Sequence, residues 1–335
     1  MGFSVDLLNS IRAEASDEYQ TRVPLATQTN FTEVGNAIQS YTILRNEYTE
    51  ALFNKIGKTK LEQMLFENKL KKYKTGTVTS QQDVEEIFIE IAKAEGAYDP
   101  TGPNPLGRRD LPDVKSIYHR MNRRDYYVLT LGDLDFVRVF RSEATHDSFV
   151  SSLLNSVYSG AEYDEWLHMK NLIASYDGYF NYQVPVIGAD GTGAKAFVKT
   201  VRKAVNDLSF PSKAFNKGGV LTKSNPEDMV LFINKDVISE VDVEVLAKAF
   251  NMGKTDFETN IEIMDNFGNL ENTYGLLVDK SWFRIYDTLS YMEPQRNAQG
   301  LFTNYFYHVH QILSLSTFKN AVRFTTAAVT AEVTP

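Results

Sequence analysis

The sequence of 335 residues predicts an α+β fold with one long helix and one long β-hairpin. Apolar side chains recur three or four positions apart from residue 147 to residue 176, the spacing of one helix face, and Gly178 follows where a helix would end. Isoleucine occupies every second position in residues 87–91, and residues 114–131 are rich in Tyr, Val and Leu, which predicts two strands. With 43% hydrophobic and 23% charged residues, the chain has a globular composition that excludes bulk disorder.

The first 60 residues are expected to form an N-terminal arm followed by one helix. The Val-Pro-Leu string at residues 23–25 predicts an extended break in the chain. Beyond it, apolar residues lie at helical spacing and predict a single helix: Val34, Ile38, Tyr41 and Leu44.

Residues 61–130 hold the predicted hairpin, whose tip lies in a proline-rich stretch. Four of the ten prolines fall between residues 100 and 112, where neither a helix nor a central strand can continue. Arms of about 18 residues, at about 3.3 Å per residue, would reach roughly 60 Å. Because an isolated two-stranded ribbon is only marginally stable in water, a protrusion of this length predicts a partner surface and therefore an assembly.

The remaining segments predict a second α+β lobe and a set of late strands. Its expected elements are a strand at 182–187, a glycine-rich turn at 188–193, a helix at 195–208, a strand at 229–233, a helix at 243–250, and strands at 276–286 and 301–315. In the last strand one face is expected to carry Phe302, Asn304, Phe306, His308 and His310. We expect these late strands to pack beside the long helix.

Charge and cysteine content exclude several classes of protein. The chain has 35 basic and 43 acidic residues, a net charge of −8, so it is a poor general binder of DNA, which is gripped by Lys and Arg. It has no cysteine, which excludes disulfides, thiolate metal sites and a cysteine nucleophile. The N-terminus shows no secretion signal, so we expect cytoplasmic synthesis. The charge-free stretch 300–318 contains polar residues that favour a strand over a membrane span.

Three candidate chemical motifs are weak. The turn at 188–195 lacks the Gly-Lys-Ser/Thr string of a phosphate-binding loop. His308 and His310 share a strand face, but no third ligand is spaced to complete a metal site, so we expect them in a core or an interface. Two clusters of acidic residues are explained as well by a solvated face as by a catalytic site. They are Asp133 with Asp135, and Glu162 with Asp164 and Glu165. No catalytic residue, cofactor or metal is therefore predicted.

A cluster of positive charge in residues 108–124 is the candidate contact surface. It holds six basic residues against two aspartates, a local balance of +4. The cluster either decorates a solvated face or meets acidic surface on an adjacent subunit. Under the second alternative the inter-subunit contacts are Arg108, Arg109, Arg120, Arg123 and Arg124.

Several residue strings, in the same order along the chain, resemble the major capsid (head) proteins of the phi-29-like podoviruses, small tailed phages of Gram-positive hosts. The strongest is Asp-Val-Glu-Val-Leu-Ala-Lys-Ala-Phe-Asn-Met at residues 242–252, with Thr-Asp-Phe at 255–257. Further strings lie at residues 23–27, 70–74, 148–152, 277–283 and 304–309. The resemblance runs from residue 19 to about residue 324, and none of its strings is a catalytic signature.

The resemblance implies the Hong Kong 97-type capsid fold, with five parts. These are the N-terminal arm and helix (1–60), the E-loop hairpin (61–130), a peripheral domain with a spine helix (131–181), an axial domain (182–295), and returning peripheral strands with the C-terminus (296–335). Some relatives add an immunoglobulin-like domain after the last strands, which is not expected in this chain.

The resemblance also implies a structural function and no enzyme activity. Copies would join as hexamers and pentamers into the icosahedral head shell of a tailed bacteriophage, with the E-loop of one subunit across its neighbour. The implied partners are other copies, a scaffolding protein, a portal connector at one vertex, and packaged double-stranded DNA held without sequence-specific binding; no membrane is implied. The protein would be assembled in the cytoplasm of the host bacterium and belong to the virion. A non-viral, encapsulin-like shell of the same fold is the alternative.

Overall fold

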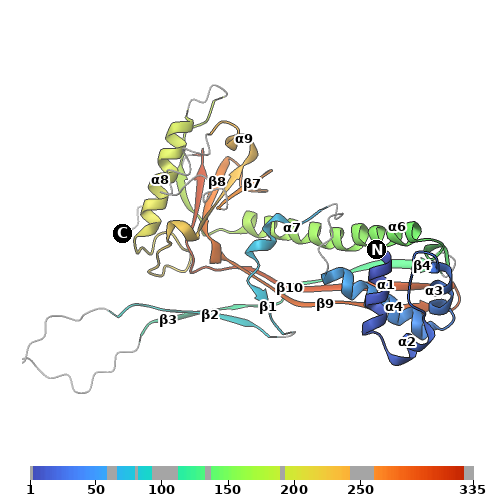
Figure 1. The fold of residues 1–335 in the computed structure, drawn as a ribbon. Coiled ribbons are helices and arrows are strands. Elements are labelled where there is room, and N and C mark those ends of the chain that lie inside the picture. The colour runs from blue at the N-terminus through green and yellow to red at the C-terminus, as the bar shows by residue number, and fades with distance from the viewer. Residues whose placement is uncertain are drawn as a thin grey trace, which may run out of the picture.

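The protein has an elongated lobe and a compact lobe, and one long helix runs from one to the other (Figure 1). The structure is a computed structural model that describes residues 3–58, 66–79, 82–92, 112–132, 137–188, 193–241 and 260–327. A thin two-stranded ribbon, β2 (Val84–Ile89) with β3 (Val114–His119), runs below the compact lobe in the same view. The α+β class predicted from the sequence is confirmed.

Four helices form the N-terminal part, where the sequence predicted an arm and one helix. They are α1 (Phe3–Glu14), α2 (Asp17–Arg22), α3 (Phe31–Gln39) and α4 (Thr42–Lys58). One face of α1 is buried through Val5, Leu8 and Ile11, which pack in a core together with residues near the ends of the long strands. The predicted helix through Val34 and Leu44 is broken because the chain turns at Ser40, whose hydroxyl donates to the Asn36 carbonyl at 2.7 Å.

The predicted long helix is confirmed, with an irregularity near its middle. It consists of α6 (Glu143–Leu153), one π-helical turn η2 (Leu154–Tyr158) and α7 (Ser159–Ser175). Met169 and Ile173 of α7 are buried against the compact lobe. The helix lies along strand β10 (Phe302–Leu315), as expected for the late strands (Figure 1).

A four-stranded sheet forms the spine of the elongated lobe. Its order is β1 (Gly76–Thr77), β9 (Phe283–Asn297), β10 and β4 (Arg123–Gly132). β10 is antiparallel to both neighbours, with Phe302 opposite Gly132 and Gln311 opposite Arg123. Thr303, Tyr305 and Val309 are buried on the face toward the helices, which confirms the predicted alternation.

Within the described residues, the two arms of the predicted hairpin pair over a short stretch only. β2 pairs with β3 over six residues, from Val84 opposite His119 to Ile89 opposite Val114. The return arm then leaves the ribbon, because the Asn122 side chain makes two 2.8 Å hydrogen bonds with the Leu313 backbone and β4 joins β10 instead. Residues 93–111, with most of the prolines, lie outside the described residues.

The compact lobe is a five-stranded sheet between two helical layers. The strand order is β5 (Phe180–Gln183), β11 (Ala321–Thr325), β8 (Thr273–Asp279), β6 (Met229–Asn234) and β7 (Ile261–Met264). Helix α8 (Ala194–Ser209) covers one face, and the end of α7 with the short helix η1 (Lys69–Tyr73) covers the other. β6 lies between the short helices η3 (Pro226–Asp228) and α9 (Lys235–Ile238).

Three strand predictions need correction. The strand expected at 276–286 is two strands in different sheets, because Asp279 caps the intervening helix η4 (Lys280–Trp282) by accepting from the Ser281 backbone at 2.9 Å. β11 lies in the five-stranded sheet and does not return to β9 and β10. β5 ends at Gln183, not at residue 187. The helix expected at 243–250 lies outside the described residues.

The described helices are too short or too polar to cross a membrane. The charge-free stretch 300–318 consists largely of strand β10, as predicted.

Candidate assembly surfaces

The ribbon has an inner face that is fastened to the compact lobe. Phe88 lies 5.8 Å from Phe318, measured between ring centres. The Lys115 ammonium donates to the Gly218 carbonyl at 3.0 Å, and Lys213 forms an ion pair with Glu90 at 2.6 Å. Because these contacts come from both strands, the ribbon is held at a fixed position on its own subunit.

Glu86 is the polar anchor of this inner face. Its carboxylate accepts hydrogen bonds from Arg284 at 2.6 Å, Ser316 at 2.9 Å and His119 at 3.1 Å. Burial alone would raise the pKa of Glu86, but the hydrogen bonds from His119 and Arg284 together lower it to about 2. The carboxylate is therefore charged at neutral pH and ties β2 to the sheet of β9 and β10.

The ribbon outer face is defined here by its exposed apolar residues, Ile87, Ile89, Val114 and Tyr118; the exposed polar residues Glu85 and Ser116 lie between them on the same face. Ile87 is 56% exposed, Ile89 61% and Tyr118 55%. Removing apolar surface from water stabilises by about 25 cal/mol per Å². Several large exposed apolar side chains on one face of a two-stranded ribbon are therefore typical of a surface that another chain covers.

A second uncovered surface lies on the four-stranded sheet, on the side away from the helices. This sheet outer face consists of Tyr126 and Val128 of β4, Tyr291 of β9, and Phe306 and His308 of β10. Tyr291 stacks on His308 at 5.3 Å with an interplanar angle of 18°, and Tyr126 lies 6.0 Å from the same imidazole. Tyr126 is 62% exposed. The rings thus form a continuous aromatic strip across three strands.

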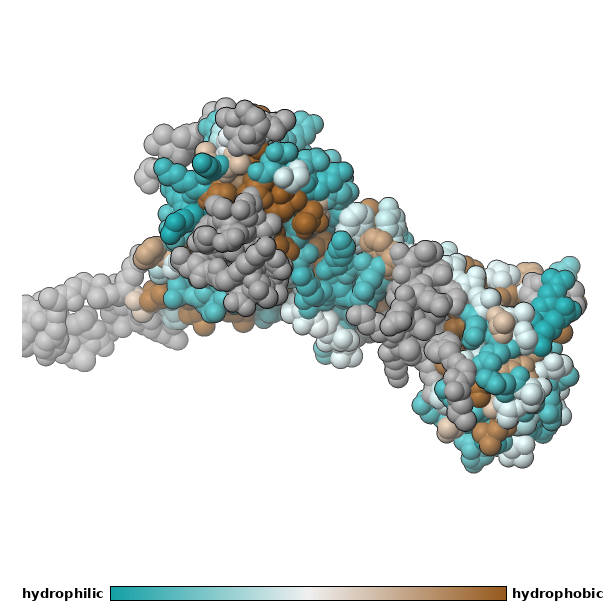
Figure 2. Space-filling model, turned by 45° about the horizontal axis from the view of Figure 1, so that its top comes forward, coloured by the Kyte–Doolittle hydropathy of each residue, from teal (hydrophilic) through white to brown (hydrophobic). Residues whose placement is uncertain are grey.

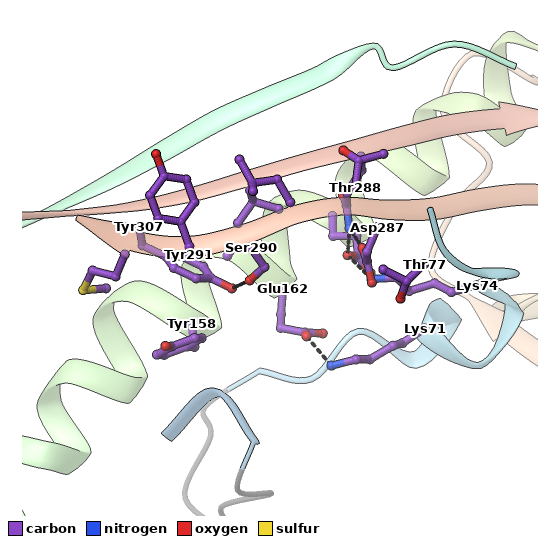
Figure 3. Close-up of a pocket in the computed structure, with 16 residues that line it drawn as sticks. Lys71, Lys74, Thr77, Tyr158, Glu162, Asp287, Thr288, Ser290, Tyr291 and Tyr307 are labelled. Carbon is purple, nitrogen blue, oxygen red and sulfur yellow. Dashed lines mark hydrogen bonds and ion pairs between the residues drawn. The ribbon is translucent and has the colours of Figure 1, made fainter. Parts of the chain in front are cut away.

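Between α7 and the opposite side of the sheet lies a cavity of about 560 Å³ (Figure 3). The charged side chains that line it pair with one another. Lys71 contacts Glu162 at 2.5 Å, and Lys74 contacts Glu165 at 2.9 Å and Asp287 at 2.8 Å. These pairs join η1 to the long helix and to β9, so the charges stabilise the subunit and are not free to bind a ligand.

The candidate arginines lie in different environments. Arg123 is 3% exposed, and its guanidinium donates to Asp125, Gln311 and Tyr127 at 2.6 to 3.0 Å. It therefore cannot form a surface with its exposed neighbour Arg124, a correction to the expected cluster. Arg120 is exposed and pairs with Asp83 at 3.1 Å. Arg108 and Arg109 lie outside the described residues.

The carboxylates of the long helix are also not a solvated face. Glu165 is buried and accepts hydrogen bonds from Asn68 at 2.8 Å and Gln311 at 2.5 Å. Burial opposes its charge, but the Lys74 ammonium and these hydrogen bonds keep the pKa of Glu165 below its ordinary value. The other pair, Asp133 and Asp135, lies outside the described residues, as do residues 189–192 of the glycine-rich turn predicted at 188–193. The described residues contain no group of three potential metal ligands.

The sequence profile of the Phi29-like phage major capsid protein family matches residues 8–325. The chain belongs to this family. It is 39% identical to the major capsid protein of Bacillus phage PZA over 98% of this chain and 74% of the relative. It is 38% identical to that of Bacillus phage B103, over 96% of this chain and 73% of the relative. This phage capsid family gives no support to the encapsulin-like alternative.

Solved capsid structures share the fold at low sequence identity. A chain from the capsid of Staphylococcus phage Andhra superposes with a TM-score of 0.64 at 12% identity, covering 81% of this chain and 88% of that one. A chain from the mature capsid of bacteriophage PhiM1 gives 0.52 at 8% identity, over 80% and 89%. The fold of this major capsid protein is thus the Hong Kong 97-type capsid fold expected from the resemblance.

Sequence reasoning missed the two apolar surfaces as candidate sites. The sequence predicted a partner surface for the hairpin as a whole and a core or an interface for His308 and His310, but it did not show which face of either strand pair is uncovered. The signal was available for the ribbon, because a two-stranded sheet cannot bury both of its faces. The aromatic strip depended on the pairing of β4 with β10, which alternation alone does not reveal.

Proposed function

We propose that this capsid protein self-assembles into a closed icosahedral head shell built from hexamers and pentamers. The observation that carries the proposal is the uncovered ribbon outer face, which no part of the described chain buries. In a shell this face would lie on a neighbouring copy, and the sheet outer face offers a second apolar surface for such contacts. Different surfaces that meet from copy to copy give the heterologous contacts from which rings are built.

The shell would enclose double-stranded DNA without reading its sequence. A net charge of −8 supports this, because strong attraction to phosphate would require a surplus of Lys and Arg. We further propose a scaffolding protein during assembly in the host cytoplasm and a portal connector at one vertex. The protein would act as a structural component of the virion and not as an enzyme.

The proposal is tested by expressing the full chain alone and with its scaffolding protein, followed by sedimentation and negative-stain electron microscopy. We expect uniform polyhedral shells in at least the second preparation. A chain that stays monomeric in both would contradict the proposal. Shells that enclose an enzyme and no DNA in infected cells would favour the encapsulin-like alternative.

A further inference from the structure

Charge is strongly segregated within the compact lobe. Residues 194–223 contain seven basic residues and one acidic residue, whereas residues 226–279 contain twelve acidic residues and three lysines. Figure 2 shows hydrophilic surface on both flanks of this lobe. A protein with an overall charge of −8 thus carries a compact region of opposite sign.

The basic residues gather on the exposed side of helix α8. The buried side of α8 packs Phe197, Val201 and Leu208 onto the five-stranded sheet. The exposed side, named here the α8 basic face, consists of Lys195, Lys199, Arg202 and Lys203.

Like charges repel along this face. Residues three or four apart are neighbours on a helix, so Lys195, Lys199, Arg202 and Lys203 destabilise one another unless an anion is near. Among the described residues, no carboxylate forms an ion pair with any of the four. Lys203 lies 5.7 Å from the centre of the Tyr182 ring, which is the one cation–π contact that the face makes within the described chain. Within the described part of the chain, this face is therefore not neutralised by ion pairs.

An exposed acidic turn lies on the other side of the lobe. Asp236 and Glu240, in and just after α9, are both exposed and four residues apart; the exposed cation beside them is Lys235. In Figure 1, α8 stands at one side of the compact lobe, and α9 with β7 stands at the other. One copy therefore presents opposite charges on two sides, the arrangement that a head-to-tail ring requires.

We propose that the α8 basic face of one copy contacts the Asp236 and Glu240 turn of the next copy around a ring. This contact rests on the proposed shell function and assigns it a charged inter-subunit surface, separate from the ribbon outer face and the sheet outer face. Complementary charges orient partners and exclude wrong registers, and their effect falls as salt rises. In a ring of copies, each adjacent pair of subunits would make this contact once.

Charge exchange in the full chain tests the contact. The basic reversal combines Lys199→Glu with Arg202→Glu, and the acidic reversal combines Asp236→Lys with Glu240→Lys. Each alone should lower the yield of shells by about tenfold, because like charges then meet, and the four changes together should restore it to within about twofold of wild type. Urea unfolding of each soluble variant verifies that the fold is intact.

A matched control separates the contact from net charge. Lys69→Glu with Arg141→Glu makes the same change in charge at exposed positions away from α8, and should assemble as wild type. Equal loss of shells in this control would overturn the contact in favour of a net-charge effect. Failure of the fourfold variant to exceed either reversal would also overturn it.

The competing occupant of the α8 basic face is nucleic acid. Fluorescence anisotropy with a short labelled DNA duplex at low salt measures this directly. If the basic reversal assembles normally but loses DNA affinity, the face binds phosphate and the proposed contact is wrong. A wild-type chain that never assembles would overturn the shell function and this contact together, whereas normal wild-type shells with normal reversal variants would overturn the contact alone.

Discussion

His146 shows how single residues fasten the N-terminal helices to the long helix. Its ring is fully buried, and its two nitrogens lie 2.7 Å from the Ser4 hydroxyl of α1 and 2.7 Å from the Tyr48 hydroxyl of α4. Phe31 and Phe140 pack against the imidazole, and the charged group beside it is Asp147, which also accepts from Ser4. A neutral ring suits this site, since both nitrogens are used and water is excluded.

This burial predicts a pH dependence of stability. Burial lowers the pKa of His146 from 6.5 to about 4, although the Asp147 carboxylate opposes the shift. The unfolded chain therefore binds a proton between these pH values while the folded chain does not. The stabilisation is complete above pH 6.5 and is lost as the pH falls toward 4, by at most about 3 kcal/mol.

Urea unfolding between pH 7.5 and 4.5 measures this effect, with His146→Gln as the non-titrating comparison. The variant should be less stable at pH 7.5, and the difference from wild type should shrink as the pH is lowered. A difference that is constant over this range would refute the role assigned to His146.

Arg123 and Arg124 are adjacent, but substitution should lower the stability of the subunit only at Arg123. Arg123→Met removes a buried guanidinium from three hydrogen-bond partners, so we expect the free energy of unfolding to fall by about 3–5 kcal/mol. Arg124→Glu changes an exposed side chain and should alter it by less than about 0.5 kcal/mol. Denaturant titration of the two variants decides the matter, and equal stability would contradict the burial of Arg123.

Arg124 remains a candidate inter-subunit contact, tested by the shell yield of Arg124→Glu.

At the scale of elements, the two faces of the ribbon should have separate roles. Ile87→Ser with Ile89→Ser changes exposed side chains only, so the subunit should keep its stability while its shells are lost. Phe88→Ser, one position away on the inner face, removes the contact with Phe318 and should lower the stability of the subunit by about 2 kcal/mol. Unfolding curves and sedimentation of both variants give the two readouts. Normal shells from the outer-face variant would show that the ribbon does not mediate assembly.

The elements that the sequence predicted well have long, uniform patterns. The helix containing Met169 and Ile173 and the strand containing Tyr305 and Val309 keep one periodicity over many residues, and each buries the expected side. The sequence did not reveal a boundary between two elements where both elements contribute apolar residues to the same core. Trp282 is buried between β8 and β9, so the apolar pattern continues through η4 although the chain changes sheets there.

Candidate site residues were harder to predict, because exposure depends on distant partners. Arg123 looked like a surface charge, yet Gln311, far along the chain, provides one of its acceptors. Glu165 likewise is buried by η1 and β10 and has no local signal of burial. The family resemblance placed the chain correctly without determining which of its charges face outward.

The whole molecule has an extended shape that suits association. The ribbon is a thin strand pair beside the compact lobe (Figure 1). The sheet outer face is exposed, and the two flanks of the compact lobe differ in charge. Monomeric proteins rarely leave such apolar surface exposed. Contacts between neighbouring copies in a shell would account for each of these features.

Cryo-electron microscopy of assembled shells, at a resolution that shows side chains, tests the central claim most directly. The ribbon outer face is the surface to inspect, through Ile87, Ile89 and Tyr118. We predict that these side chains lose their solvent exposure against a second copy of the chain. A well-ordered shell in which they still face solvent would contradict the account.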